Sequence, residues 1–211
     1  MRTLLVVALL VLALACGDDD GDGGDDAAAT SSTIGAPSTT TTSTTTPGPA
    51  GDPALREELL ALMEQDVAER TGQATTNGDA TRADRLREII AEHGWPTFAL
   101  VSTDGATAAW LIAQHADFDP AFQQQVVELM RPLVDGGQAD ASELAYLEDR
   151  VAVNTGQDQV YGTQIRCQGG EPVPATPIVD EAAVDERRAA VGLAPLADYY
   201  AELAAACAAE E

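Results

Sequence analysis

The sequence predicts a mainly α-helical domain with one small β-hairpin, an α+β fold that follows a signal peptide and a disordered linker. Apolar residues recur at helical spacing through most of residues 53–156. Residues 160–178 then change to β-prone side chains, a glycine pair and prolines. No internal repeat is visible, and residues 53–211 are long enough for one compact multi-helix domain with its own core.

The N-terminus has the pattern of a lipoprotein signal. Arg2 precedes an apolar run of about a dozen residues, too short for a membrane-spanning helix, which needs roughly 20. The run ends at Ala15-Cys16, and a small residue directly before a cysteine is typical of lipoprotein processing. We therefore predict a signal peptide over residues 1–15 and acylation of Cys16, with the protein anchored on the extracytoplasmic side of the cell membrane. An ordinary secretory signal cleaved near Ala15 is the alternative.

Residues 16–52 are predicted to be a disordered tether. They are rich first in Asp and Gly and then in Thr and Ser, and such segments lack the apolar surface that offsets chain entropy. The chain is also acidic, with 35 Asp and Glu against 11 basic residues and a net charge of −24. This charge argues against nucleic acid as a partner, because nucleic-acid binding needs a basic surface. Every basic residue is Arg, which together with abundant Ala, Gly and Asp indicates a bacterium with a GC-rich genome.

Three cysteines are present. If Cys16 carries lipid, Cys167 and Cys207 are the only possible disulfide pair, in a compartment that permits disulfides. Two separate buried thiols are the alternative. No metal site is predicted, because neither cysteine has a neighbouring Cys or His.

Five helices are predicted before the hairpin. The first follows Asp52-Pro53 and runs over 54–70, and the second runs over 79–93 before Gly94 ends it. Residues 98–101 are predicted to form a strand or a loop packed under a helix. A third helix follows over 106–116, and it is apolar nearly all round, as expected of a core helix.

The fourth helix opens at Asp119-Pro120 and ends at Gly136, and the fifth covers 141–153. Residues 160–167 are predicted to be the first arm of the hairpin, with the proline-bearing residues 171–178 as its edge arm. Two more helices are expected, one from Asp180 through Arg188 and one over 196–208.

Two histidines stand out as candidates for chemistry. His93 ends the second helix in His93-Gly94-Trp95-Pro96, and His115 lies near the end of the third in Gln114-His115-Ala116-Asp117. Histidine is the commonest general base, but a histidine at a helix C-terminus is also favoured simply by the helix dipole. His115-x-Asp117 alone is a weak metal signal, and the sequence identifies no cofactor.

Two further groups of polar residues lie later in the chain. Asp149-Arg150 falls on the fifth helix, either as a half-buried ion pair or as part of a site. Gln159, Tyr161 and Gln164 belong to a polar row at the start of the hairpin. That row could bind a polar ligand or fasten the hairpin to helix ends.

These blocks, in this order, resemble a bacterial domain family known only as a domain of unknown function. The matching segments are His93-Gly94-Trp95-Pro96, Trp110-Leu111-Ile112 leading to Gln114-His115-Ala116-Asp117, Leu147-x-Asp149-Arg150 and Tyr161-Gly162-Thr163-Gln164. The resemblance covers about residues 53–205 and brings no assigned activity. It implies that the polar residues of these blocks form one site.

Three functions are compatible with such a site: binding of a small polar ligand or envelope component, hydrolysis of an envelope substrate, and a purely structural or interaction role. For hydrolysis, His115 would be the general base and Asp117 or Asp149 its orienting carboxylate. For binding, tryptophan and tyrosine rings would form walls and glutamine amides would supply hydrogen bonds. The candidate residues are His93, Trp95, Gln114, His115, Asp117, Asp149, Arg150, Gln159, Tyr161 and Gln164.

Overall fold

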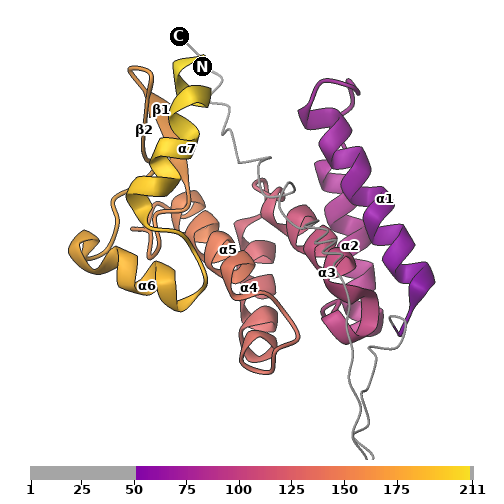
Figure 1. The fold of residues 1–211 in the computed structure, drawn as a ribbon. Coiled ribbons are helices and arrows are strands. Elements are labelled where there is room, and N and C mark those ends of the chain that lie inside the picture. The colour runs from indigo at the N-terminus through magenta and orange to yellow at the C-terminus, as the bar shows by residue number, and fades with distance from the viewer. Residues whose placement is uncertain (1–50, 210–211) are drawn as a thin grey trace, which may run out of the picture. The chain divides into compact units, whose positions relative to one another are not determined.

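A computed structural model describes residues 51–209, which form a helical domain with one hairpin, as predicted (Figure 1). The predicted signal peptide, most of the tether and Cys16 lie outside the described residues. The elements are α1 (Pro53–Arg70), α2 (Asp79–His93), α3 (Phe98–Gln114), α4 (Pro120–Asp135), α5 (Ala141–Asn154), β1 (Ile165–Gln168), β2 (Glu171–Pro174), the 3-10 turn η1 (Glu181–Ala183), α6 (Val184–Ala190) and α7 (Leu196–Ala208).

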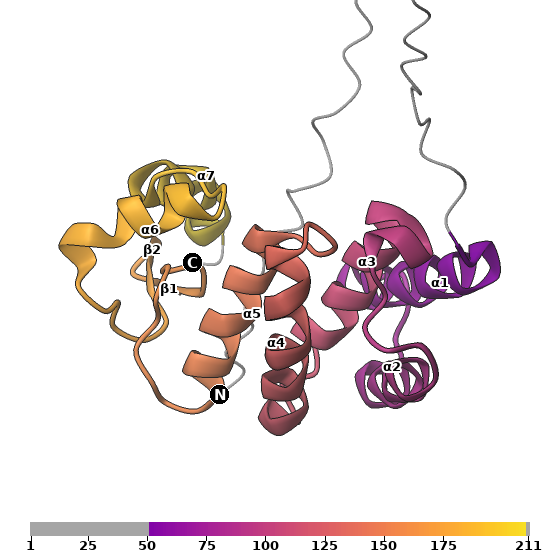
Figure 2. The ribbon, with the colours of Figure 1, turned by 90° about the horizontal axis from the view of Figure 1, so that it is seen from below.

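The first two helices pack against the core helix α3. α1 and α2 both contact it, as Figures 1 and 2 show. α1 begins where the Leu55 backbone N–H donates to the Asp52 carboxylate at 3.0 Å, with Pro53 in its first turn. The core side chains include Leu59, Leu86 and Ile112. Helical spacing predicted these positions because a surface helix turns one apolar stripe towards the core.

The start of α3 differs from the prediction of a strand or loop at 98–101. These residues form the first turn of α3, which Thr97 caps by accepting a hydrogen bond from Leu100 N. Gln138, far along the chain, also accepts the Ala99 N–H through its side chain at 3.1 Å. Ser102 then interrupts the helix with φ 61° and ψ 174°, a conformation rare for a residue with a side chain. The kink at Ser102 explains why the sequence pattern separates 98–101 from the rest of the helix.

α4 and α5 form a helical pair that packs beside α3 (Figure 2). Asp119 caps α4 by accepting from Phe122 N at 3.0 Å, and Asp140 caps α5 by accepting from Ser142 N at 2.8 Å. The contact of α5 with α3 brings the end of α3, where His115 lies, close to the middle of α5.

The C-terminal part combines the hairpin with α6 and α7. β1 and β2 are antiparallel, with Cys167 opposite Pro172. The first strand is shorter than predicted, because residues 160–164 form a loop and only Gln159 makes an isolated bridge, to Ile178. The helix expected from Asp180 opens instead as η1 and becomes α-helical at Val184.

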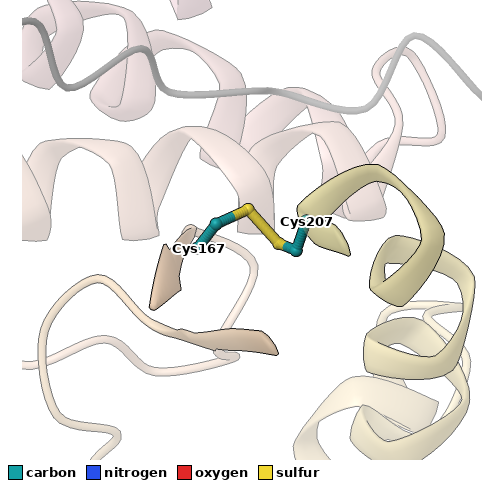
Figure 3. Close-up of a disulfide and its surroundings, with 2 residues drawn as sticks. All are labelled: Cys167 and Cys207. Carbon is teal, nitrogen blue, oxygen red and sulfur yellow. A yellow bond between two sulfur atoms is a disulfide. The ribbon is translucent and has the colours of Figure 1, made fainter. Parts of the chain in front are cut away.

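α7 packs against β2, and the disulfide Cys167–Cys207 joins β1 to the last turn of α7 (Figure 3). The pair that the sequence left for a disulfide is therefore bonded. Within residues 51–209, no helix is both long and apolar enough to cross a membrane.

Candidate functional site

His115 forms a buried pair with a carboxylate from the first helix. Its Nδ1 lies 2.8 Å from Asp66 Oδ2, and the histidine is 8% exposed and the aspartate 0%. Arg70 Nε donates to the same oxygen at 3.0 Å and lies 2.9 Å from Nδ1. Nδ1 cannot accept from Arg70 while it donates to Asp66, so we assign both N–H groups to the shared acceptor Asp66 Oδ2.

This arrangement fixes the protonation state of both partners. Burial raises the pKa of Asp66, but the hydrogen bonds from His115 and Arg70 outweigh it and hold the pKa below its usual value. Burial lowers the pKa of His115 and outweighs the hydrogen bond and negative charge of Asp66, which raise it; the positive charges of Arg70 and Arg150 lower it further. His115 is therefore neutral at pH 7, with its hydrogen on Nδ1 and a lone pair on Nε2.

A buried arginine fixes the other oxygen of Asp66. Arg82 Nη2 donates to Asp66 Oδ1 at 3.1 Å, to Glu69 Oε2 at 2.9 Å and to Asp79 Oδ1 at 2.6 Å. With Asp66 held by Arg82 from α2 and by Arg70 from its own helix, the carboxylate has little freedom to turn away from His115. Asp66, rather than Asp117 or Asp149, is the carboxylate that orients His115, which corrects the expectation from sequence.

Gln114, the residue before His115, is fully buried, and both its amide oxygen and its amide nitrogen lack a hydrogen-bond partner among residues 51–209. Gln123 is equally buried but well satisfied. Its Nε2 donates at 3.1 Å to the carbonyls of Ala113 and Gln114, and its Oε1 accepts from Asn154. The two buried glutamines therefore differ in whether their amides have hydrogen-bond partners. An unpaired buried amide lowers the stability of the fold.

Arg150 lies close by on α5. Its side chain is 1% exposed, and its one ion pair with a residue in the range 51–209 is a long contact of 3.4 Å from Nη1 to Asp117 Oδ2. Its Nε is fully buried and without a partner in the described part of the chain. Burial lowers the pKa of Arg150, yet an arginine stays charged in proteins.

The contacts between α3 and α5 show how these groups align. Trp110 packs edge-on against Tyr146, with ring centroids 6.2 Å apart, and Asp117 contacts Arg150. Gln114 lies one turn after Trp110, and Arg150 lies one turn after Tyr146, so both fall at the same level of the contact. The indole Nε1 of Trp110 is also buried without a partner in residues 51–209. We call Trp110, Gln114, His115 and Arg150 the α3–α5 polar site.

Asp149 has a structural role instead of the ion pair or site role expected from sequence. Its carboxylate accepts hydrogen bonds from the backbone N–H groups of Val160, Tyr161 and Thr163 and from the Thr163 hydroxyl, at 2.7–3.2 Å. Burial raises the pKa of Asp149, while these donors act in the opposite direction. Asp149 therefore fixes the loop that leads into the hairpin rather than forming an ion pair.

The polar row at the start of the hairpin is also occupied by structural hydrogen bonds. Gln159 Nε2 donates to the carbonyls of Gln164 and Thr176, both at 3.0 Å, and Gln159 Oε1 accepts from Gln164 N at 2.8 Å. Gln164 Nε2 donates to the Tyr146 carbonyl at 3.2 Å. The backbone of Tyr161 is held by Asp149 and, through its carbonyl, by Arg188 Nη1 at 2.8 Å. Of the two alternatives, these contacts match fastening of the hairpin.

His93 lies away from the α3–α5 polar site, and Trp95 is a core residue. Arg82, near the start of α2, contacts Asp66, and His93 is eleven residues further along the same helix, a rise of about 16 Å. His93 is exposed and its nearest charged partner is Glu92, at 3.7 Å. Trp95 is part of the hydrophobic core. The expected meeting of His93 with His115 at one site is not seen.

Asp66 and Arg82 are functional candidates that the sequence analysis missed. Asp66 lies seven residues after Leu59 and four before Arg70, on the buried stripe of α1, and Arg82 lies four residues before Leu86 on the buried stripe of α2. A charged residue on the apolar face of each of two successive helices is the signal that could have found this pair.

No group of three or more His, Cys, Asp or Glu side chains within the described range is arranged to hold a metal ion.

No curated protein and no solved structure matches the chain. A family model does match, over residues 52–209, which spans the whole helical domain and contains every residue of the α3–α5 polar site. The chain therefore belongs to DUF6624, a family of unknown function.

Proposed function

We propose that the protein is a lipid-anchored domain on the extracytoplasmic side of the cell membrane that binds a small polar ligand at the α3–α5 polar site. The anchor is supported by the apolar run that ends at Ala15-Cys16 and by the solvated composition of residues 17–52. The disulfide between Cys167 and Cys207 suits an oxidising compartment outside the cytoplasm.

The anchor can be tested by replacing Cys16 with serine. We expect the wild-type protein, expressed in a bacterium that processes lipoproteins, to enter the detergent phase on phase partition. The Cys16→Ser variant should enter the aqueous phase, because a serine cannot receive the lipid. Identical processing and partition of both proteins would contradict the anchor.

The observation that carries the ligand proposal is the buried Gln114 amide, which has no partner for its donor or its acceptor in residues 51–209. Leaving such a group unpaired costs about 1–3 kcal/mol. Proteins keep such destabilising groups mainly at functional sites, where a bound ligand can supply the missing hydrogen bonds. Arg150 Nε and Trp110 Nε1 add two more buried donors without a partner in residues 51–209, one on each of the same two helices.

A thermal-shift series tests this binding. The probes are acetate, glycine, N-acetylglucosamine and inorganic phosphate, each added to the full chain and to its Gln114→Met variant. We expect at least one probe to raise the melting temperature of the wild type and to have no effect on Gln114→Met. Gln125→Met, an exposed substitution on α4, is the matched control and should respond like the wild type. Equal stabilisation of wild type and Gln114→Met would place the ligand elsewhere.

Hydrolysis is a second candidate, favoured by the Asp66–His115 pair. A neutral imidazole that donates Nδ1–H to a buried carboxylate leaves Nε2 able to accept a proton from water, as a general base does. We expect any hydrolysis of 4-nitrophenyl acetate at this site to be lost in His115→Gln. If neither hydrolysis nor binding is found, the structural role that the sequence also allows is the better explanation.

A further inference from the structure

Arg150 presents an unused edge of its guanidinium group. A guanidinium carries five N–H donors in a rigid plane. In Arg150, Nη1 makes the long contact to Asp117, and Nε is buried without a partner among residues 51–209. The edge that Asp117 does not occupy is therefore the one on which Nε lies, together with Nη2. These two N–H groups point in parallel and match the two oxygens of a carboxylate.

Asp117 is not placed to fill this edge. Its Oδ1 accepts from Asn154 Nδ2 at 3.0 Å and from Gln123 Nε2 at 3.4 Å, which holds the carboxylate on the Nη1 side of Arg150. Its side chain is also 47% exposed, so its charge is partly screened by water. A buried arginine with one weak, half-exposed partner needs another anion to offset the loss of its hydration.

The other groups nearby favour a planar monoanion over phosphate. Arg70, the next cation, already pairs with Asp66 and Asp79, at 3.0 and 2.9 Å. One available guanidinium edge matches one carboxylate, whereas a phosphate dianion is tetrahedral and has more charge to neutralise. Gln114 can add an N–H donor to the carboxylate, and its Oε1 can accept from a hydroxyl or amine of the same molecule.

We infer that the ligand of the α3–α5 polar site carries a carboxylate, which Arg150 binds through Nε and Nη2 with the Gln114 amide beside it. The inference rests on the proposed binding function and names its ligand class, a small organic acid or amino acid.

The test follows the Nε–H signal of Arg150 by NMR while ¹⁵N-labelled protein, residues 16–211 with Cys16→Ser to omit the lipid, is titrated. Sodium acetate and succinate are the carboxylate probes. Acetamide is the neutral isostere of acetate, and inorganic phosphate is the competing anion. We expect a saturable shift of the Arg150 signal with acetate or succinate, and binding of acetamide and phosphate that is at least about 10-fold weaker.

Arg150→Lys keeps the charge but has no two-pronged edge, so it should weaken carboxylate binding by about 10- to 100-fold. Arg131→Lys, the same change at an exposed arginine on α4, is the control and should bind like the wild type. If Arg150→Lys does not fold, the titration of the wild type with carboxylate, amide and phosphate probes tests the carboxylate assignment by itself.

The outcomes separate the two proposals. Acetamide or phosphate binding at this signal as tightly as acetate would overturn the carboxylate assignment and leave the polar-ligand site standing. If no probe moves the Arg150 signal and no probe stabilises the wild type over Gln114→Met, both proposals fall.

Discussion

Replacing Asp149 with alanine is expected to lower the free energy of unfolding by about 3–5 kcal/mol. The carboxylate accepts four N–H and O–H groups from residues 160–163, at 2.7–3.2 Å. Alanine would leave those buried donors without an acceptor. The loop packs closely against the rest of the domain. Gly162 within it has φ 68°, and a Cβ added there would lie only 2.5 Å from the Ile178 side chain.

Urea unfolding of the domain, followed by circular dichroism, measures this loss. Asp158→Ala, an exposed aspartate in the same connection, is the control and should change the free energy of unfolding by less than about 0.5 kcal/mol. A loss of less than about 1 kcal/mol for Asp149→Ala would contradict the role we assign to this carboxylate, since a single lost hydrogen bond would account for it.

The second large effect concerns the disulfide. Cys167 and Cys207 are 40 residues apart, and closing a loop of this length stabilises a fold by about 4 kcal/mol in the chain-entropy estimate. We expect the double variant Cys167→Ser/Cys207→Ser to lose stability of this order. The loss should concentrate in α7, because the bond ties the last turn of this helix to β1 (Figure 3).

Unfolding of the wild type in the presence of a reductant provides the control, since it removes the bond without changing a side chain. Reduced wild type and double variant should have similar midpoints, both well below that of the oxidised protein. Equal stability of the oxidised wild type and the double variant would show that packing of α7 on β2, rather than the bond, holds this part of the domain.

Most of the fold could be predicted from sequence because its helices are local structures with clear ends. Asp52-Pro53 and Asp119-Pro120 mark helix starts, and the second helix was predicted over 79–93 as the structure has it. The failures have tertiary causes. The first turn of α3 donates a hydrogen bond to Gln138, and the backbone N–H groups of Val160, Tyr161 and Thr163 bind Asp149 instead of a neighbouring strand.

The site was only partly accessible to the same reasoning. His115 was found because histidine is rare in this chain, but its partner Asp66 lies 49 residues earlier on another helix. Gln159 and Gln164 looked as suitable for a ligand as Gln114, because a sequence does not show which amides find partners. Tertiary packing determines which amides are paired. Gln159 and Gln164 form hydrogen bonds within and next to the hairpin, whereas Gln114, at the contact between α3 and α5, has no partner in residues 51–209.

The two buried glutamines provide the most direct test of the account. Methionine has nearly the volume of glutamine and no polar group to satisfy, so it removes the amide with little change in packing. In the absence of ligand, Gln114→Met should raise the free energy of unfolding by about 1 kcal/mol, because an unpaired amide is removed. Gln123→Met should lower it by about 2–4 kcal/mol, because Ala113, Gln114 and Asn154 lose their partner. Urea unfolding of the two variants gives both values. If Gln114→Met proves as destabilising as Gln123→Met, the Gln114 amide already has hydrogen-bond partners in the free protein. The proposed ligand site would then be contradicted.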